Sequence, residues 1–355
     1  MTAMEEWNGR ACRTEIFGTL GPACSDTETL RAMFREGMTG IRLNLSHTSL
    51  AEAAPLIKLY REAAAQEHCE PQLLIDLQGP ELRIGALQHP LMLTEGQQVL
   101  LLAHGQSLAP EISGEARAAV LPVQKAVLEA IEAGDRILLD DGRIELQVQS
   151  LQPVCASVLR GGKLTGRKSL KIEGKYVHTP VLTETDLANL RDAVAAGVTA
   201  VMQPFVRGGE DLRILRKALQ ECGAGDLRIF AKIENMEGVR NIEEILPEAD
   251  MIVIARGDLG NDMPLWKLPA VQKELSDICR NQGVPFLVVT QMLTSMIENA
   301  VPTRAEVSDI FHAVLDGASA VMVTNETAAG KHPAEAVRYL SGTCAEAEAF
   351  LRSKG

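Results

Sequence analysis

Residues 227–240 read LRIFAKIENMEGVR, and this stretch contains the junction that decides the fold. The apolar run IFA predicts a buried strand, and the residues after it have the spacing of a helix. Lys232 and Glu234 stand where the strand ends. Because alternate residues of a strand share a face, both side chains are expected to point the same way. The pattern of the whole chain explains why charged side chains occupy the end of an apolar strand.

The strand-then-helix pattern repeats along the chain. Apolar segments that are each followed by a segment of helical periodicity are expected to form eight strands, at residues 15–22, 39–47, 72–80, 199–205, 228–234, 250–258, 284–291 and 318–326. Eight such units without a glycine-rich first turn favour a closed (β/α)8 TIM barrel of the α/β class over an open doubly wound sheet. We predict that residues 1–79 and 179–355 form this barrel.

A different pattern occupies residues 80–178. Short apolar segments alternate there with turn signals, and LLDDGRIEL contains the pair Asp141-Gly142, which is typical of a hairpin turn. The segment follows the third predicted strand. We therefore predict a small β-rich lid domain that is inserted into the barrel at this point.

The composition restricts the kinds of partner. A formal net charge of -12 and a pI near 5.2 argue against nucleic-acid binding, which usually requires a basic surface. No segment approaches the roughly 20 apolar residues of a membrane span, and the N-terminus lacks the features of a signal peptide. Seven cysteines without a C-x-x-C pair are typical of a reducing compartment. We expect a cytoplasmic protein that binds neither nucleic acid nor membrane.

In a (β/α)8 barrel, chemistry gathers at the carboxyl ends of the strands. Glu234 and Asp258, from neighbouring strands, could supply two oxygens to one hard cation such as Mg²⁺. They could instead form ion pairs with Lys232 or Arg256, and the residues alone leave both arrangements open. The full set of polar residues at the strand ends is Thr19, Arg42, Asn44, Asp76, Gln203, Lys232, Glu234, Arg256, Asp258, Thr290, Gln291, Thr324 and Glu326.

Longer motifs resemble those of one family. GTLGPAC, GIRLNLSH, GPELRIG, LLDDGRIEL, AKIENMEGV, ARGDLG, TQMLTSMI, PTRAEVSDI and AVLDGASAVM occur in the order in which pyruvate kinases contain them. The chain resembles the pyruvate kinase family from Thr14 to about Glu348. That family has a (β/α)8 barrel with a β-rich lid after the third strand. The resemblance implies phosphoryl transfer from phosphoenolpyruvate to ADP, which gives pyruvate and ATP.

The resemblance also implies roles for residues at the barrel mouth. Lys232 would neutralise charge on the transferred phosphoryl group and on the enolate, and Arg42 would bind the phosphate. Glu234 and Asp258 would hold Mg²⁺ (or Mn²⁺). A cluster of this kind suits phosphoryl transfer, which depends mainly on cations placed around the moving group.

Three further binding sites are implied by the same resemblance. The main chain near Gly257, with Asp258, would bind the substrate carboxylate, and Thr290 would lie beside the carbon that takes a proton. The implied K⁺ ligands are Asn44, Ser46, Asp76 and the carbonyl of Leu77, and Glu81 matches a glutamate of potassium-dependent members. The residues implied near the nucleotide phosphates are Arg83, His47 and Lys168.

Departures from the family pattern concern substrate fit, lid closure and assembly. They include Leu77-Gln78, Gln203-Pro204, Phe311-His312, Asn325 and the segment SLKIEG. The sequence also stops at Gly355, where most pyruvate kinases continue into a C-terminal domain with an effector site and part of the tetramer interface. Sugar-phosphate activation is therefore not expected, and any homo-oligomer would form through barrel surfaces.

Other functions stay open at this point. A barrel with Lys, Glu, Asp and Mg²⁺ could stabilise an enolate in a lyase or decarboxylase that acts on a keto acid such as oxaloacetate. A catalytically degenerate homologue could bind phosphoenolpyruvate without turnover. A Schiff-base aldolase that uses Lys232 is less favoured, because the adjacent metal-binding pair would keep the amine charged.

Overall fold

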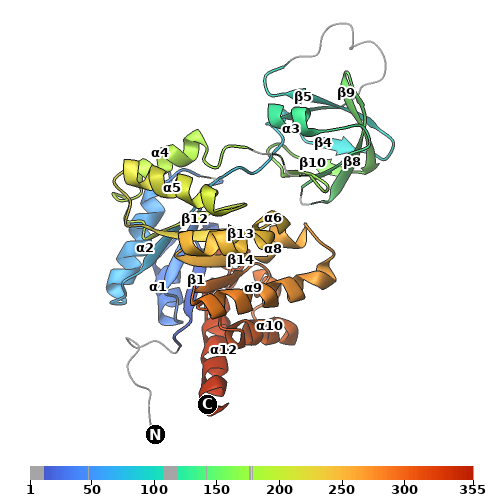
Figure 1. Cartoon of the computed structure of the whole chain (residues 1–355). Helices are drawn as coiled ribbons and strands as arrows, with labels where there is room; N and C mark the ends of the chain where they lie inside the picture. Colours follow the sequence, from blue (N-terminus) through green and yellow to red (C-terminus); the bar gives the residue numbers. More distant parts are fainter. Residues whose placement is uncertain are drawn as a thin grey trace. The chain divides into compact units, whose positions relative to one another are not determined.

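The computed structural model describes residues 12–46, 48–106, 119–140, 142–175, 177 and 179–354. The chain divides into two compact units (Figure 1). One unit is formed by residues 1–79 and 181–355, and the other by residues 80–180.

The first unit contains a closed barrel of parallel strands. In the described part of the chain its strands pair in the order β1-β16-β15-β14-β13-β12-β3-β2. Their bounds are β1 Glu15–Thr19, β2 Gly40–Asn44, β3 Gln72–Asp76, β12 Ala200–Gln203, β13 Arg228–Ile233, β14 Met251–Ala255, β15 Phe286–Val289 and β16 Ala320–Met322. Each strand is bonded on both sides, so the sheet has no free edge. The predicted fold class, a (β/α)8 TIM barrel with a β-rich insert, is confirmed.

Helices surround the barrel (Figure 1). Those of at least nine residues are α1 Thr27–Arg35, α2 Ala54–Gln66, α4 Glu184–Asp192, α5 Gly209–Glu221, α9 Leu268–Gln282, α10 Arg304–Leu315 and α12 Pro333–Lys354. Shorter helices are α6 Met236–Arg240, α7 Ile242–Ile245, α8 Arg256–Gly260 and α11 Asn325–Ala328. Helices α4 and α10 begin with capping boxes, whose side chains satisfy the first unpaired N–H groups. Among the described residues no helix is both long and apolar enough to cross a membrane.

The barrel strands are buried on both faces, as parallel strands usually are. Inward-facing residues fill the barrel, where the rings of Phe17 and Phe230 lie 6.5 Å apart at 88°. The alternate residues, among them Ile16 and Ile229, pack against the surrounding helices. Because the faces alternate so strictly, the last inward position of each strand lies at the mouth of the barrel.

The second unit is built from antiparallel and parallel strands around its own apolar core. Its strands are β4 Leu91–Leu93, β5 Gln98–Ala103, β6 Ala119–Val123, β7 Arg136–Leu139, β8 Ile144–Leu151, β9 Val154–Arg160, β10 Gly162–Leu164 and β11 Leu170–Ile172, with helix α3 Lys125–Ala130. Strands β7 and β8 pair antiparallel with Leu139 opposite Ile144. The hairpin that the sequence predicts is therefore present, although Asp141 of its turn lies outside the described residues.

Several strands end earlier at the barrel mouth than the sequence predicts. Residues 318–326 are predicted as one strand, but β16 ends at Met322 and helix α11 begins at Asn325, while β1 ends at Thr19 and β3 at Asp76. The segment 250–258 was expected to be strand throughout, but β14 ends at Ala255 and helix α8 begins at Arg256. The ladders explain this end: β14 last pairs with β13 at Ile254 and with β15 at Ala255, and neither neighbour continues the pairing. Gly257 and Asp258 therefore lie in the first turn of a helix.

Helix α12 fastens the start of the first strand. Its Glu348 accepts hydrogen bonds through Oε1 from the N–H of Arg13 at 2.8 Å, from the N–H of Thr14 at 2.8 Å and from the hydroxyl of Thr14 at 2.9 Å. Residues more than 330 positions apart are joined in this way at the amino end of β1. This contact stabilises the barrel at the end opposite to its mouth.

We expect Glu348→Ala to lower the free energy of unfolding by about 2–3 kcal/mol, because hydrogen bonds to a charged acceptor contribute about 1.5–3 kcal/mol and the two donors of Thr14 would be left buried. Chemical denaturation measures the change. Glu346→Ala on the exposed face of the same helix is the matched control and should stay within about 0.5 kcal/mol of wild type. Equal losses in the two variants would contradict this prediction.

Candidate functional site

Charged side chains from three strands meet at the mouth of the barrel; β2 and β3 are neighbours, and β12 separates β3 from β13. Arg42 lies on β2, Asp76 ends β3, and Lys232 lies on β13 with Glu234 one residue beyond the strand. All four are at inward positions, in step with the residues that fill the barrel below them. The sequence predicted each of these residues for the site, and the fold brings them together.

The carboxylate of Asp76 lies between the two cations. Its Oδ2 is 2.6 Å from Nη2 of Arg42 and 3.1 Å from Nζ of Lys232, and its side chain is only 2% exposed. Burial alone would raise the pKa of Asp76, but the charges of Lys232 and Arg42 outweigh this effect and hold the pKa below its ordinary value. Asp76 is therefore ionised and serves both cations as their counter-ion.

Lys232 also forms an ion pair with Glu234, at 3.0 Å between Nζ and Oε1. Burial acts to lower the pKa of Lys232, but the negative charges of Asp76 and Glu234 raise it above its ordinary value. The ammonium group is therefore kept protonated. Such a lysine suits charge neutralisation and does not suit a Schiff-base nucleophile, which needs a neutral amine.

Glu234 is held by two contacts. Unlike Asp76 and Lys232, it has a pKa that is shifted toward the neutral form. Its Oε2 accepts the N–H of Phe205 at 2.8 Å, and Phe205 has a φ of 53°, which is uncommon for a residue other than glycine. Burial raises the pKa of Glu234 to about 7; Lys232 opposes this rise, and the charge of Asp258 adds to it. The two carboxylates repel one another, and a cation between them would relieve the repulsion.

Glu234 and Asp258 fit a divalent cation by their chemistry. Both offer hard oxygen ligands, and a pair of carboxylates leaves positions for water and substrate, as Mg²⁺ sites usually do. Within the described ranges no group of three or more His, Cys, Asp or Glu side chains is arranged to hold a metal ion. Of the ion pairs considered from the sequence, Glu234 with Lys232 is present, whereas Arg256 pairs with Asp309 at 2.7 Å.

Gly257 and Thr290 lie against each other. A Cβ at position 257 would lie 3.1 Å from Cγ2 and 3.5 Å from Oγ1 of Thr290. Because glycine has no Cβ, the threonine side chain can pack directly against the main chain of residue 257. Thr290 follows β15 with a φ of 79°, a conformation that costs a β-branched residue about 1–3 kcal/mol. The predicted carboxylate-binding main chain and the predicted threonine are thus neighbours.

The residues implied for K⁺ lie at the ends of the neighbouring strands β2 and β3: Asn44 and Asp76 are the last strand residues, and Ser46 and Leu77 follow them. Asn44 and Asp76 are opposite each other in the ladder, and the amide oxygen of Asn44 accepts the N–H of Ser46 at 3.1 Å. The N–H of Leu77 donates to the carbonyl of Met202 at 3.1 Å, and the side chain of Leu77 is buried. These residues are close in the fold, and their role in binding K⁺ stays a prediction.

Arg83 and Lys168, the two residues of the insert that were predicted to bind the nucleotide, lie next to each other. Arg83 pairs with Ser169 in an antiparallel bridge, and the N–H of Ile84 donates to the carbonyl of Lys168 at 2.9 Å. Arg83 lies 2.6 Å from Glu81. Lys168 lies 2.6 Å from Asp140, and the third predicted residue, His47, lies outside the described residues.

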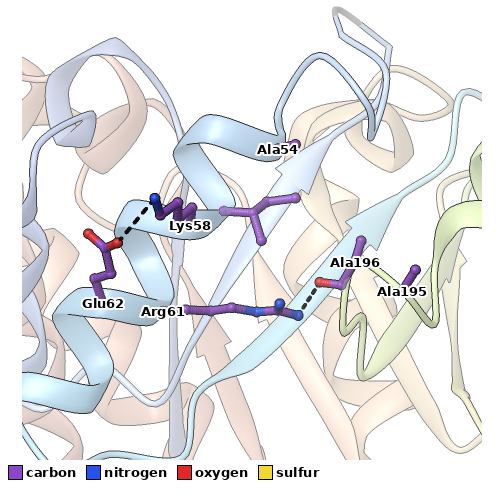
Figure 2. Close-up of a pocket in the computed structure, with 7 residues that line it drawn as sticks. Ala54, Lys58, Arg61, Glu62, Ala195 and Ala196 are labelled. Carbon is purple, nitrogen blue, oxygen red and sulfur yellow. Dashed lines mark hydrogen bonds and ion pairs between the residues drawn. The ribbon is translucent and has the colours of Figure 1, made fainter.

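A hollow on the outside of the barrel is separate from the strand ends. Figure 2 shows Lys58 directed toward Glu62, 3.8 Å away, and Arg61 donating to the carbonyl of Ala196. These contacts pair its charged groups with partners inside the hollow itself. Its volume is about 270 Å³, and its lining residues are Ala54, Ile57, Lys58, Arg61, Glu62, Ala195 and Ala196, none of which was predicted for the site.

Two features of the site were not predicted from the sequence. Asp76 serves as the counter-ion of Lys232 and Arg42, and the main-chain N–H of Phe205 binds Glu234. The role of Asp76 could have been found from the alternation of inward and outward residues along a strand. Arg42, Asp76 and Lys232 all fall on inward positions of their strands. The second has no signal in the sequence, because it depends on an unusual φ at Phe205.

Comparisons with known proteins agree on one family. A family model described as "Pyruvate kinase, barrel domain" matches residues 11–337. A protein named pyruvate kinase from Chlamydia pneumoniae is 38% identical over 341 residues, which is 96% of this chain and 69% of that protein. Pyruvate kinase from Bacillus licheniformis is 36% identical over 347 residues, or 96% of this chain and 58% of that protein.

A human relative, named pyruvate kinase PKLR, is 39% identical over 351 residues, which is 95% of this chain and 60% of that protein. This chain therefore spans between 58% and 69% of the length of these three relatives.

We predict that binding of a divalent cation depends on pH. Glu234 must be ionised to bind a cation, and with a pKa of about 7 it is mostly protonated at pH 6 and mostly ionised at pH 8. Mg²⁺ or Mn²⁺ should therefore raise the midpoint of thermal unfolding more at pH 8 than at pH 6. Equal shifts at the two pH values would contradict the assignment.

Glu234→Gln should abolish the metal effect at both pH values. Because the pKa of Glu234 is raised on folding, its charge opposes folding above pH 7 and is absent in acid. The metal-free variant should therefore have a higher free energy of unfolding than wild type at pH 8, and the difference should shrink toward pH 5. Glu210→Gln, at a highly exposed carboxylate, is the control and should behave as wild type.

Proposed function

Since the chain belongs to the pyruvate kinase family, we propose that it transfers the phosphoryl group of phosphoenolpyruvate to ADP. The bond between phosphorus and the enol oxygen breaks, and a bond forms between phosphorus and a terminal oxygen of ADP. The enolate that leaves takes a proton on carbon and becomes pyruvate. The observation that best supports this proposal is the buried Lys232, which two carboxylates keep protonated at the mouth of the barrel.

Lys232 would act through its charge. The transferred group is negative throughout the reaction, and charge also grows on the enol oxygen as the bond to phosphorus breaks. A preorganised cation in a site with little water stabilises such a transition state more than the ground state. Asp76 and Glu234 fix the ammonium group in place before the substrate binds, so that little reorganisation is needed.

Arg42 would bind the phosphate beside this lysine. Its guanidinium group is 14% exposed and is oriented by Asp76 through Nε at 2.8 Å and Nη2 at 2.6 Å. A planar guanidinium has five donors, so a bond to Asp76 leaves others for a phosphate. Asp76 pairs with both cations, and Glu234 pairs with Lys232 as well, so Arg42 keeps the larger share of its charge for an anionic substrate.

Membership of the family implies a divalent metal cofactor. We propose that the ion is Mg²⁺ or Mn²⁺ and that Glu234 and Asp258 hold it. When bound, it would supply a Lewis acid for the phosphoryl and enolate oxygens. K⁺ would be bound by Asn44, Ser46, Asp76 and the carbonyl of Leu77, as the resemblance implies.

The substrate carboxylate would lie at the first turn of α8. Gly257 has no side chain to obstruct an approach to the main chain, and Thr290 stands beside it. On the insert, Arg83 and Lys168 would bind the phosphates of the nucleotide, with residues 80–178 as a lid. We place the protein in the cytoplasm, in keeping with its seven free cysteines, and association of copies through barrel surfaces stays a prediction.

Lys232→Met should lower the rate of ATP formation from phosphoenolpyruvate and ADP by at least about 10²-fold, the loss typical of one preorganised charge-stabilising group. A coupled assay with Mg²⁺ and K⁺ measures the rate, and circular dichroism checks that the variant is folded. Lys217→Met, at an exposed lysine of α5, is the matched control and should keep the wild-type rate. Unchanged activity in Lys232→Met would exclude the proposed role of this lysine.

Replacement of K⁺ by tetramethylammonium at constant ionic strength should reduce ATP formation in the wild-type protein. The same rate in both salts would argue against the K⁺ site.

Turnover of oxaloacetate without nucleotide at a higher rate than phosphoenolpyruvate turnover would favour a decarboxylase instead. Thermal stabilisation by phosphoenolpyruvate without turnover across several nucleotides and metals would indicate a binding protein.

A further inference from the structure

Two consecutive residues after β15 have left-handed backbone conformations. The φ of Thr290 is 79° and that of Gln291 is 57°. Neither residue is a glycine, and threonine is β-branched, so this conformation is unfavourable for both side chains. Such a conformation persists only where the surroundings hold it, and the contacts of this segment show what does so.

Arg256 holds the carbonyl groups of both residues. Its guanidinium group donates to the carbonyl of Thr290 from Nε at 3.0 Å and from Nη2 at 2.7 Å, and from Nη2 to the carbonyl of Gln291 at 3.3 Å. The side chain is only 10% exposed. Three donors of one rigid, planar group therefore reach two successive carbonyls, which a lysine could not do in the same way.

The arginine is itself fixed from the opposite side. Its Nη1 lies 2.7 Å from Oδ2 and 2.9 Å from Oδ1 of Asp309 on helix α10. The carboxylate balances the buried charge and orients the plane of the guanidinium group. The pair thus links the end of β14, the segment after β15 and helix α10.

A second side chain fastens the other end of the segment. Glu326, 1% exposed, accepts the N–H of Leu293 through Oε1 at 3.2 Å and the N–H of Thr324 through Oε2 at 2.7 Å. A cation therefore binds the carbonyls at the start of residues 290–293, and an anion binds an N–H at their end. The backbone of this segment is held at both ends.

These contacts matter at the predicted substrate site. Arg256 is the residue before Gly257, and the side chain of Thr290 stands against Gly257. One side chain therefore connects the main chain that would bind the substrate carboxylate with the threonine beside it. A shift of Thr290 would move its hydroxyl away from that position.

We propose that Arg256 is a positioning residue, which keeps Thr290 in its left-handed conformation with the hydroxyl beside Gly257. The proposal rests on the proposed function, in which phosphoenolpyruvate binds at Gly257 and Thr290. Arg256 need not touch the substrate. Its loss should lower kcat/KM for phosphoenolpyruvate, because Thr290 is displaced, and should leave KM for ADP unchanged.

The test is Arg256→Lys, which keeps the charge but cannot reach both carbonyls with a planar group. We expect kcat/KM for phosphoenolpyruvate to fall at least tenfold, while KM for ADP stays within twofold of wild type. Arg216→Lys is the matched control, since Arg216 also binds two carbonyls, of Gly225 and Leu227, and a carboxylate, Asp250. It should keep wild-type kinetics.

A second substitution that restores activity would show that Arg256→Lys acts by displacing Thr290 and not by a general loss of structure. Glycine adopts a positive φ without penalty, so Gln291→Gly added to Arg256→Lys should restore kcat/KM for phosphoenolpyruvate by about fivefold. Wild-type kinetics in Arg256→Lys, or a KM for ADP that rises as much as the KM for phosphoenolpyruvate without rescue by Gln291→Gly, would overturn the proposal. A wild-type protein that forms no ATP would instead refute the proposed function.

Asp309→Asn serves if Arg256→Lys does not fold. It loosens the arginine without removing it and should lower kcat/KM for phosphoenolpyruvate about threefold, again without a change in KM for ADP. An Asp309→Asn protein with wild-type kinetics would then overturn the proposal.

Discussion

The buried carboxylate of Asp76 is the constraint on which the site depends. Arg42 comes from the neighbouring strand β2 and Lys232 from β13, one strand beyond the other neighbour, β12. Without a counter-ion, the two buried cations would repel each other and lose their hydration. Asp76 binds both, and its own negative charge is stabilised by them. The barrel mouth therefore contains a fixed positive pair before any ligand arrives. The remaining acidic groups, Glu234 and Asp258, are left with an excess of negative charge on the neighbouring side.

The fold and most of the site could be predicted from the sequence because a barrel strand has a strict period of two. Apolar runs located the strands, their carboxyl ends placed Asp76 at the mouth, and the alternation of faces put Lys232 and Glu234 on the same side. The end of β14 was predicted incorrectly, because the local pattern of RGDLG does not reveal where the neighbouring strands stop pairing. The hydrogen bonds from Arg256 to the carbonyls of residues 290 and 291 could not be predicted, since they join distant segments and depend on an unusual backbone conformation.

The insert shows a different use of charge. Arg83 and Lys168 are neighbours, but each is already paired, with Glu81 and with Asp140. A phosphate group that binds here has to compete with these carboxylates, which face solvent only in part. Their presence favours a ligand with several charges over one with a single charge.

The position of the insert also affects how the barrel can form. Strands β3 and β12 pair directly, with Leu74 opposite Ala200, although residues 77–199 separate them in the sequence. Pairing across so long a segment is slow if that segment is still a flexible loop, because its ends must find each other by chance. An insert that folds first around its own core would shorten the effective loop. If the insert folds first, the barrel closes faster, and a mutation that slows folding of the insert would leave open strand edges exposed for longer.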